Sequence, residues 1–593
     1  MSRVVSQKYK DIMAGIVLPA TLYRITFGIE SVGAASDVTL TTENEEMPFS
    51  NLQNIKDRYF PTEDYMTQEW NTFPLDRSKV VIEDMSKVQK NMFAPNILSN
   101  SEAEYVDNKP RFQATFTKLI DLIGLSFVFD NLSGTYPSSL TIRAYNGETL
   151  VKEIEGRPTS YDYAIEMDLT NIDKFTVEVN SSNLPYARTR IARVYFGLID
   201  VHTEADTTEV SQTYSLSPIN NELFKSTIDY KMENFDSKYD IDNPQGIYRF
   251  ITEQQPITIE YSVDGKEWIE AGNYLSSGRA KIEDNLTSIE GIDQIQYMND
   301  TYNKDVHRTT PISLYDLALN VLSDFGWTLN KFGEFPYRLD DGLKNIMTLG
   351  TLPVAKHSEC LQIIAFAAGM GLYVDDKGYI CIKPLPTEVV DNDYYINFSY
   401  MGKEPTPEQI EPLSQIDMTV HNYTIGSEIE EINKAEYTIT GSDTLKIEYD
   451  LSTEHTVTIA SGGTITASRF YGRYCELDVT GNGTFEVIVK GKKIEDNTSV
   501  HTKVYSPRGE VAPYDNPLIT NNSLAENVAS YIGDYLKCRT RYTLDWLEDY
   551  RVNVGDLVRI KSQYTDNLVG RVIRIKTSEP KLMGEMEVVI IES

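Results

Sequence analysis

Short runs of alternating apolar and polar residues, separated by turn-forming pairs, recur along this chain and limit it to a β-rich fold. The segment EQQPITIEYSVDGKEWIEAGNYLS (253–276) shows the pattern. Ile257, Ile259 and Tyr261 would share one face of a strand, and Asp264–Gly265 is typical of a hairpin turn. The segment has no nucleophile beside a base and no metal-ligand spacing, so we expect its role to be structural.

Three segments follow the helical period instead. In the first, Ser313 is the expected N-cap and Gly326 the expected stop. A second helix should end near Gly369, and a third should cover 522–537, where Ser523 and Glu526 have the spacing of a capping box. Because 593 residues exceed what one hydrophobic core supports, we predict a mainly β, multidomain (α+β) protein.

The formal net charge of −33 is distributed unevenly. Residues 1–200 hold 20 Lys and Arg against 27 Asp and Glu, a net charge of −7, whereas the remaining residues hold 35 against 61, a net charge of −26. A surface this acidic repels phosphate groups, so no specific nucleic-acid binding is expected. One explanation of the negative charge is solubility. The other is a surface along which DNA can move without binding. No apolar run reaches the ~18 residues of a membrane span.

Residues able to carry chemistry are scattered. No two of the six histidines are four residues apart, and no P-loop, GxSxG or GxGxxG motif is present. His357 is expected at the surface or boundary of its helix. The four cysteines form no CxxC pair and are expected to be reduced core residues: Cys360, Cys381, Cys475 and Cys538.

One group of oxygen ligands is closely spaced but departs from the calcium-loop pattern, and turns explain it: Asp236, Asp240, Asp242 and Asn243. We therefore predict no catalytic, cofactor-binding or metal-binding residues, no cofactor, and no enzyme activity. Aromatic residues of the N-terminal β segment are candidates for stacking on sugars, with packing as the alternative. The candidate glycan contacts are Tyr136, Tyr145 and Tyr186.

The order of sequence modules resembles that of tail hub proteins of tailed bacteriophages and related prophages of Gram-positive bacteria. The resemblance rests on FKSTIDYKMENFDSKYDIDNPQGIY, on a strand that begins QQP, on the hairpin that ends GNYLS, and on the ending YRVNVGDLVRIKS with GRVIRIKT. The segments YMTQEWNTFPLD and PYARTRIARVYFG are also similar. Residues 200–593 carry most of the resemblance, and no single motif is diagnostic.

The resemblance implies a hub of two tube-protein-like β-barrel domains, a small α/β domain and an inserted jelly-roll β-sandwich that is galactose-binding-like. The strand at 22–29 would then pair with strands after 200 and with the 253–276 hairpin. The expected divisions are 1–36, an N-terminal segment with the first hub strand; 37–199, the inserted sandwich; 200–308, a hub β-barrel domain; 309–390, the α/β domain; 391–511, a β-rich domain; and 512–593, a helix with hub β-barrel strands.

The resemblance also implies a location and partners. The chain would form a homotrimer at the distal tail tip of a virion, after assembly in the cytoplasm of the bacterial host. Its partners would be the distal tail or tube protein, the tape-measure protein, and baseplate or tail-tip proteins. Two rival functions are a carbohydrate-binding adhesin that recognises cell-wall glycans through the sandwich and a wall-degrading enzyme. Hub proteins that degrade walls usually carry an added peptidase or lysozyme domain, and none is expected here.

Overall fold

The computed structural model shows a protein built mainly from strands, as predicted. The residues that it describes are 3–15, 20–30, 34–47, 50–56, 92–130, 134–235, 237–243, 246–326, 336–391, 393–397, 405, 407–459, 462–538, 540–561, 568–579 and 583–591. The resemblance segment at 65–76 and Asp236 lie outside these residues.

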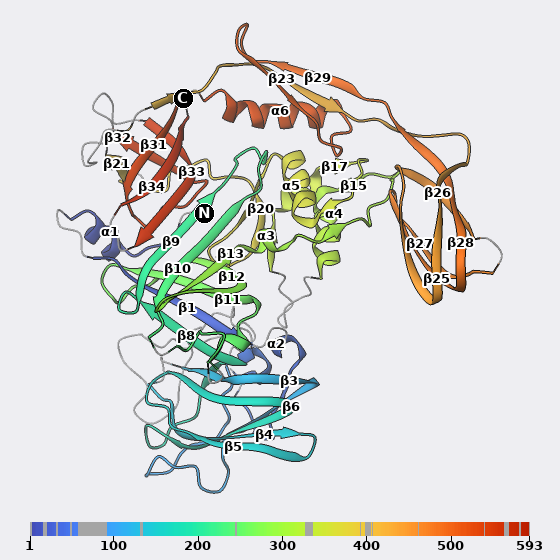
Figure 1. Cartoon of the computed structure of the whole chain (residues 1–593). Helices are drawn as coiled ribbons and strands as arrows, with labels where there is room; N and C mark the ends of the chain where they lie inside the picture. The colour runs from blue at the N-terminus through green and yellow to red at the C-terminus, as the bar shows by residue number, and fades with distance from the viewer. Residues whose placement is uncertain are drawn as a thin grey trace.

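A thirteen-stranded sheet forms the centre of the molecule (Figure 1). Its N-terminal half, here the first β unit, has the strand order β9-β10-β13-β12-β11-β1-β8. The bounds of these strands are β1 Leu22–Glu30, β8 Gly197–Thr203, β9 Thr207–Ser215, β10 Lys225–Glu233, β11 Glu253–Ser262, β12 Ile269–Glu283 and β13 Leu286–Ile292. Strand β1 lies between β11 and β8 and pairs antiparallel with both, which confirms the predicted pairing of 22–29 with the 253–276 hairpin.

The hairpin of β11 and β12 contributes side chains to the hydrophobic core. Ile257, Ile259 and Tyr261 are at most 1% exposed, because the alternation of β11 turns all three toward the interior. The turn between the strands contains Gly265 at φ +68°, a left-handed conformation that glycine adopts at little cost. The Tyr261 hydroxyl donates to Oε1 of Gln212 at 2.7 Å, so this buried phenol has a polar partner.

The C-terminal strands extend the same sheet. They are β21 Tyr395–Asn397, β22 Pro407–Gln409, β31 Thr540–Leu547, β32 Leu557–Lys561, β33 Leu568–Glu579 and β34 Met583–Ile590. Strand β33 pairs antiparallel with β9, so this C-terminal β unit continues the first β unit edge to edge without a break in the sheet. Helix α1 (Gln7–Met13) lies beside the junction of the two units (Figure 1).

An inserted β unit lies between β1 and β8 in the chain, and β8 then rejoins the central sheet. Its six-stranded sheet consists of β2 Thr39–Thr41, β3 Arg111–Phe129, β4 Pro137–Asn146, β5 Thr149–Gly156, β6 Asp162–Ser182 and β7 Ile191–Tyr195, with helix α2 at Ala34–Asp37 and a 3-10 turn at Leu52–Lys56. Phenylalanine is the most frequent residue in its separate core. The predicted turn at Asn146 and Gly147 links β4 to β5, and Gly147 has φ +58°.

A small α/β unit follows the first β unit, after the short helix α3 (Gln294–Tyr297). Ser313 accepts a hydrogen bond from the Asp316 amide at the start of α4 (Leu314–Phe325), and Gly326 ends the helix at φ +93°. Helix α5 (His357–Ala368) ends at Gly369 with φ +62°, as predicted. The short strands of this unit are β14 Thr301–Tyr302, β15 Ile312–Ser313, β16 Tyr337–Leu339, β17 Met347–Thr348, β18 Ala355–Lys356, β19 Gly371–Val374 and β20 Ile380–Lys383.

The chain next builds an arm and a lobe (Figure 1). The arm is the sheet of β23 Leu413–Val420, β29 Ser499–Val504 and β30 Glu510–Tyr514, with α6 (Asn522–Leu536) against one face. The lobe, residues 423–496, contains β24 Tyr423–Ile425, β25 Glu430–Glu448, β26 Ser452–Ile459, β27 Thr464–Phe470 and β28 Tyr474–Asp496. Strand β30 crosses residue 511, where we expected a division. The six expected divisions of the chain remain predictions.

The predicted capping box of the third helix is wrong. Asn521, two residues before Ser523, caps α6 by accepting a hydrogen bond from the Leu524 amide at 2.9 Å. Glu526 is therefore free of a capping role and binds Lys503 and His501 of β29 instead, at 2.6 and 2.9 Å. These ion pairs attach the helix to the sheet of the arm.

Gly350 lies where the α/β unit meets the segment before α6. A Cβ atom there would overlap the Pro517 carbonyl oxygen and would stand 2.6 Å from Cα of Leu518, and both are backbone atoms that cannot rotate away. We expect Gly350→Ala to lower the free energy of unfolding by about 1–3 kcal/mol in urea denaturation. The exposed neighbour provides the control, since Leu349→Ala should change it by less than about 0.5 kcal/mol. Equal values for the two variants would contradict the expected overlap.

Candidate functional site

A cluster of buried polar groups lies at the junction of the first β unit, α1 and the C-terminal β unit. The Tyr550 hydroxyl lies 2.8 Å from Oε2 of Glu548 and 3.1 Å from Oε1 of Glu579. One hydroxyl proton cannot serve two carboxylates, so the arrangement favours a proton on at least one carboxyl group. Burial raises the pKa of Glu548 to about 8 and that of Glu579 to about 7.

Three distant parts of the chain hold this cluster, which we call the seam cluster: Tyr261, Glu548, Tyr550 and Glu579. The Tyr261 ring of β11 stacks on Tyr550 with centroids 4.0 Å apart and planes inclined by 10°. Tyr9 of α1 donates to Oδ1 of Asp549 at 3.3 Å and accepts a hydrogen bond from the Tyr550 amide at 3.0 Å. The cluster therefore joins the N-terminal helix, the central hairpin and the C-terminal strands.

Arg551 lies beside the seam cluster and is buried. It bonds Oδ2 of Asp549 at 2.7 Å and Oδ2 of Asp391 at 3.1 Å, and its guanidinium lies 4.5 Å from the Tyr394 ring centroid. Lys10 of α1 approaches the same oxygen of Asp391 at 2.9 Å. These charges are paired inside the junction, which gives them a structural role rather than an open catalytic arrangement.

The three candidate glycan contacts do not form one platform. Tyr136 and Tyr186 belong to neighbouring loops, since Asn183 exchanges backbone and side-chain hydrogen bonds with Tyr136. Tyr145 lies at the opposite end of β4, where its ring packs against the Lys174 ammonium at 5.0 Å. Their role in glycan binding stays a prediction. Tyr186 stands out because it is 47% exposed beside exposed Leu184 and holds φ +55°.

A positive φ costs a tyrosine about 1–2 kcal/mol relative to the right-handed region. Because the exposed ring adds little packing, we expect Tyr186→Gly to leave the unfolding free energy unchanged or to raise it by up to about 1 kcal/mol. Tyr186→Ala, which keeps the strain and lacks the ring, is the matched variant. Thermal unfolding measures both variants. If the free energy of unfolding fell by more than about 1 kcal/mol in both, the Tyr186 ring would be packed in the fold and would not be available to contact a glycan.

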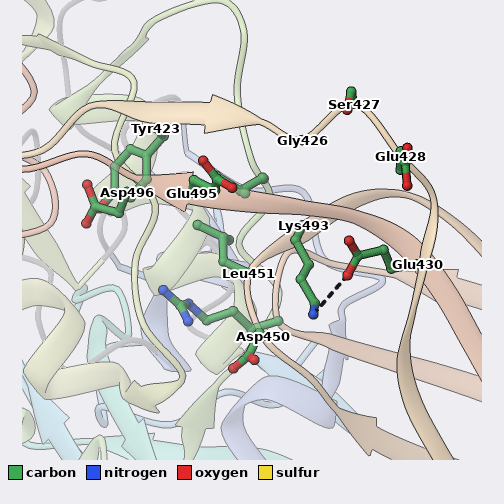
Figure 2. Close-up of a pocket in the computed structure, with 12 residues that line it drawn as sticks. Tyr423, Gly426, Ser427, Glu428, Glu430, Asp450, Leu451, Lys493, Glu495 and Asp496 are labelled. Atoms are coloured by element: carbon green, nitrogen blue, oxygen red, sulfur yellow. Dashed lines mark ion pairs between the residues drawn. The ribbon is translucent and has the colours of Figure 1, made fainter.

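A pocket of about 470 Å³ lies at the neck that joins the lobe to the arm (Figure 2). Its wall contains Tyr423, Glu428, Asp450, Arg473 and Asp496. Figure 2 shows Lys493 and Glu430 paired across the rim, and their charged atoms are 3.0 Å apart. We call this space the neck pocket. The mixed charges of its wall provide no arrangement of nucleophile, base and oxyanion donor.

The expectation that His357 lies at a surface or boundary is wrong. It is 3% exposed, with Nδ1 2.7 Å from the Asp300 carbonyl oxygen and Nε2 3.0 Å from Oδ2 of Asp324. The histidine begins α5, and its ring turns inward because Asp324 near the end of α4 provides a buried acceptor. The contact fastens the two helices together.

The remaining predicted features are distributed as follows. All four cysteines are buried, which confirms their prediction as core residues. Asp240 accepts a hydrogen bond from Asn234 and Asn243 donates to the Ser237 carbonyl, so both side chains stabilise the turn.

Two searches of the described ranges found nothing. No cluster of three or more His, Cys, Asp or Glu is arranged there to hold a metal ion. None of the helices in these ranges has the length and the apolar composition of a membrane span.

Sequence reasoning missed the seam cluster. Glu548 and Tyr550 belong to the run LEDYRV, where charged residues interrupt strand-like segments. That interruption was a usable signal, because charged residues in a buried segment need partners. The partners themselves come from residues near 9, 261 and 579, and no local pattern links these positions.

Comparison with known proteins gives weak structural likenesses. No protein-family model matches the chain, and no curated protein matches it. Among solved structures, the 43 kDa tail protein of prophage MuSo2 from Shewanella oneidensis is similar at a TM-score of 0.33 and 11% identity, over 66% of this chain and 94% of that chain.

Two further tail proteins are similar over the same share of this chain, 66%. One is from Neisseria meningitidis MC58, with a TM-score of 0.36, 9% identity and 94% of its own length covered. The other is prophage tail protein gp18 from Listeria monocytogenes EGD-e, with a TM-score of 0.35, 11% identity and 91% covered. Scores this low do not assign a fold or a function to this chain.

Proposed function

We propose that this chain is a structural protein of a phage or phage-like tail, and that it acts as the hub at the distal end of the tail tube. The order of sequence modules supports the proposal. The observation that carries it is the β9–β33 pairing, which joins two β units edge to edge in one sheet. A hub of two adjoining tube-like units per chain needs such a connection.

The proposed hub is a homotrimer without catalytic activity. Three copies, each with two β units, would present six units to a six-fold tube, and a closed ring leaves no edge strand unpaired. The partners would be the tube or distal tail protein, the tape-measure protein and the tip proteins. The net charge of −26 on residues 201–593 fits a lumen through which DNA passes without phosphate contacts.

Labelling of intact particles tests the proposal. A specific antibody against the chain, viewed by negative-stain electron microscopy, should mark the distal tip of tails. The antibody should leave the tube and the capsid unmarked. Label on a cell surface, or particles without any label at the tip, would overturn the proposal and favour an adhesin.

A further inference from the structure

The first described residues of the chain lie across the junction of three units. Residues 3–13, which we call the clasp, precede β1 and contain helix α1, seven residues long. A helix this short is marginal in water, so its order depends on what it contacts. The contacts are with residues near 264 in the first β unit, near 376 in the α/β unit, near 391 and near 550 in the C-terminal β unit.

Arg3 is the first anchor of the clasp. Its side chain is 8% exposed, and one terminal nitrogen donates to the Ala271 carbonyl at 3.0 Å and to Oδ1 of Asp376 at 2.9 Å. The other terminal nitrogen donates to the Tyr550 and Val552 carbonyls at 3.2 and 3.4 Å. One guanidinium therefore connects the first β unit, the α/β unit and the C-terminal β unit. Its planar fork of fixed donors suits this task, whereas a lysine ammonium is a compact point charge.

Tyr9 is the second anchor. It is 1% exposed and packs in the core of the first β unit. Its hydroxyl contacts Asp549 and accepts a hydrogen bond from the Tyr550 amide. Between the anchors, the Ser6 amide donates to Oε1 of Glu267 at 2.7 Å, and the Ser6 hydroxyl caps α1 by accepting from the Tyr9 amide at 3.1 Å. The clasp is thus fixed at both ends and at its centre.

The charges of the clasp and of the surface beneath it are opposite. The clasp carries three cations and one acid in a chain whose net charge is −33. Lys8 lies 2.5 Å from Oδ2 of Asp264, and Lys10 lies 2.9 Å from Oδ2 of Asp391. Complementary charge of this kind favours the association of a basic segment with this surface. The carboxylates that receive the clasp, which we call the acidic seat, are Asp264, Glu267, Asp376, Asp391 and Asp549.

Other contacts hold the acidic seat in place. Asp376 accepts a hydrogen bond from the Asn553 side chain at 3.1 Å. Arg551 bonds both Asp391 and Asp549, and the β9–β33 pairing joins the two β units. None of these contacts uses an atom of the clasp. The acidic seat therefore has the character of a preformed binding site, which pays little ordering cost when its ligand arrives.

We propose that the acidic seat is a binding site for a short basic peptide segment, and that residues 3–13 occupy it as an exchangeable ligand. The site selects an arginine followed, six residues later, by a tyrosine with a lysine on each side. The same segment of a second copy competes for the seat. While it is bound, the clasp fastens the two β units and the α/β unit at one point.

Peptide exchange in a nicked full chain tests the proposal. A site-specific protease sequence inserted after Gly15 allows the clasp to be cut from the folded chain. A synthetic peptide of residues 1–15, with fluorescein at its C-terminus, then reports binding by fluorescence anisotropy. We expect the labelled peptide to replace the cut segment, and its binding to weaken as NaCl rises from about 0.05 to about 0.5 M. The nicked chain should keep its β-sheet circular dichroism after the cut segment has been washed out.

Variant peptides separate the anchor from simple charge attraction. Arg3→Ala should weaken binding by about 10–100-fold, because it removes hydrogen bonds made by a buried cation. Lys8→Ala is the matched control, since it removes the same charge from a side chain that is 60% exposed, and should weaken binding by less than about 5-fold. In a nicked chain that carries Asp376→Asn, the difference between the unsubstituted and Arg3→Ala peptides should shrink.

Three results would overturn the proposal. If the labelled peptide does not replace the cut segment, the clasp is not exchangeable. If the β-sheet signal is lost with the cut segment, the clasp is an integral part of the fold and the seat is not preformed. If Arg3→Ala and Lys8→Ala weaken binding equally, the seat attracts positive charge without recognising the arginine.

Discussion

Arg551→Met is expected to lower the free energy of unfolding by about 3–5 kcal/mol, the usual cost of removing one partner from a buried ion pair. Methionine keeps much of the side-chain length but leaves Asp549 without its charged partner. The Asp549 carboxylate is 4% exposed and contacts the Arg551 guanidinium through both oxygens. An uncompensated charge at that depth either stays at high cost or takes up a proton.

The matched variant is Arg574→Met on the neighbouring strand β33. Arg574 pairs with Glu587 at 2.9 Å, but its side chain is 41% exposed, so water screens the pair. Unfolding in guanidinium chloride measures both variants. We expect Arg574→Met to lower the free energy of unfolding by about 0–1 kcal/mol. Similar losses for Arg551→Met and Arg574→Met would mean that the charges at the junction contribute no more than a surface pair.

Local features of this fold could be predicted because their causes lie within a few residues. Ser313 and Gly326 bound α4 since a hydroxyl can accept from an amide three residues ahead and glycine tolerates positive φ. The predicted cap of α6 is wrong because spacing alone does not decide between competing partners. Ser523 and Glu526 have the right spacing, but Asn521 competes for the helix start and β29 competes for Glu526.

Long-range features followed from the sequence only where a resemblance gave the pairing. The partnership of β1 with β11 was expected on that ground, since about 230 residues separate the strands and periodicity carries no pairing information. The seam cluster and the two carboxylate contacts of His421 had no such guide. A histidine between two carboxylates 75 and 94 residues away looks, in sequence, like any isolated histidine.

The free energy of unfolding is expected to fall as the pH rises from about 5 to 9, because of the seam cluster. In the folded chain the pKa of Glu548 is raised to about 8 and that of Glu579 to about 7, chiefly by burial. In the unfolded chain both carboxyl groups ionise near 4.5. Between these values the folded state binds more protons than the unfolded state, so rising pH favours unfolding.

The expected loss is on the order of 3–5 kcal/mol over that range, from the usual 1.36 kcal/mol per pKa unit and a single shared cluster. Urea denaturation at fixed ionic strength measures it. Glu548→Gln with Glu579→Gln keeps the shape and removes both ionisations, so the decline above about pH 6 should largely disappear. Burial raises the pKa values of Asp293 and Asp556 to about 6, and these groups keep a smaller decline at lower pH. Glu585→Gln, at a 45% exposed carboxylate, should retain it. The prediction is contradicted if the doubly substituted chain loses stability with pH as steeply as the unsubstituted chain. In that case the two buried carboxyl groups carry no excess protons in the folded state, and the groups that respond to pH lie elsewhere.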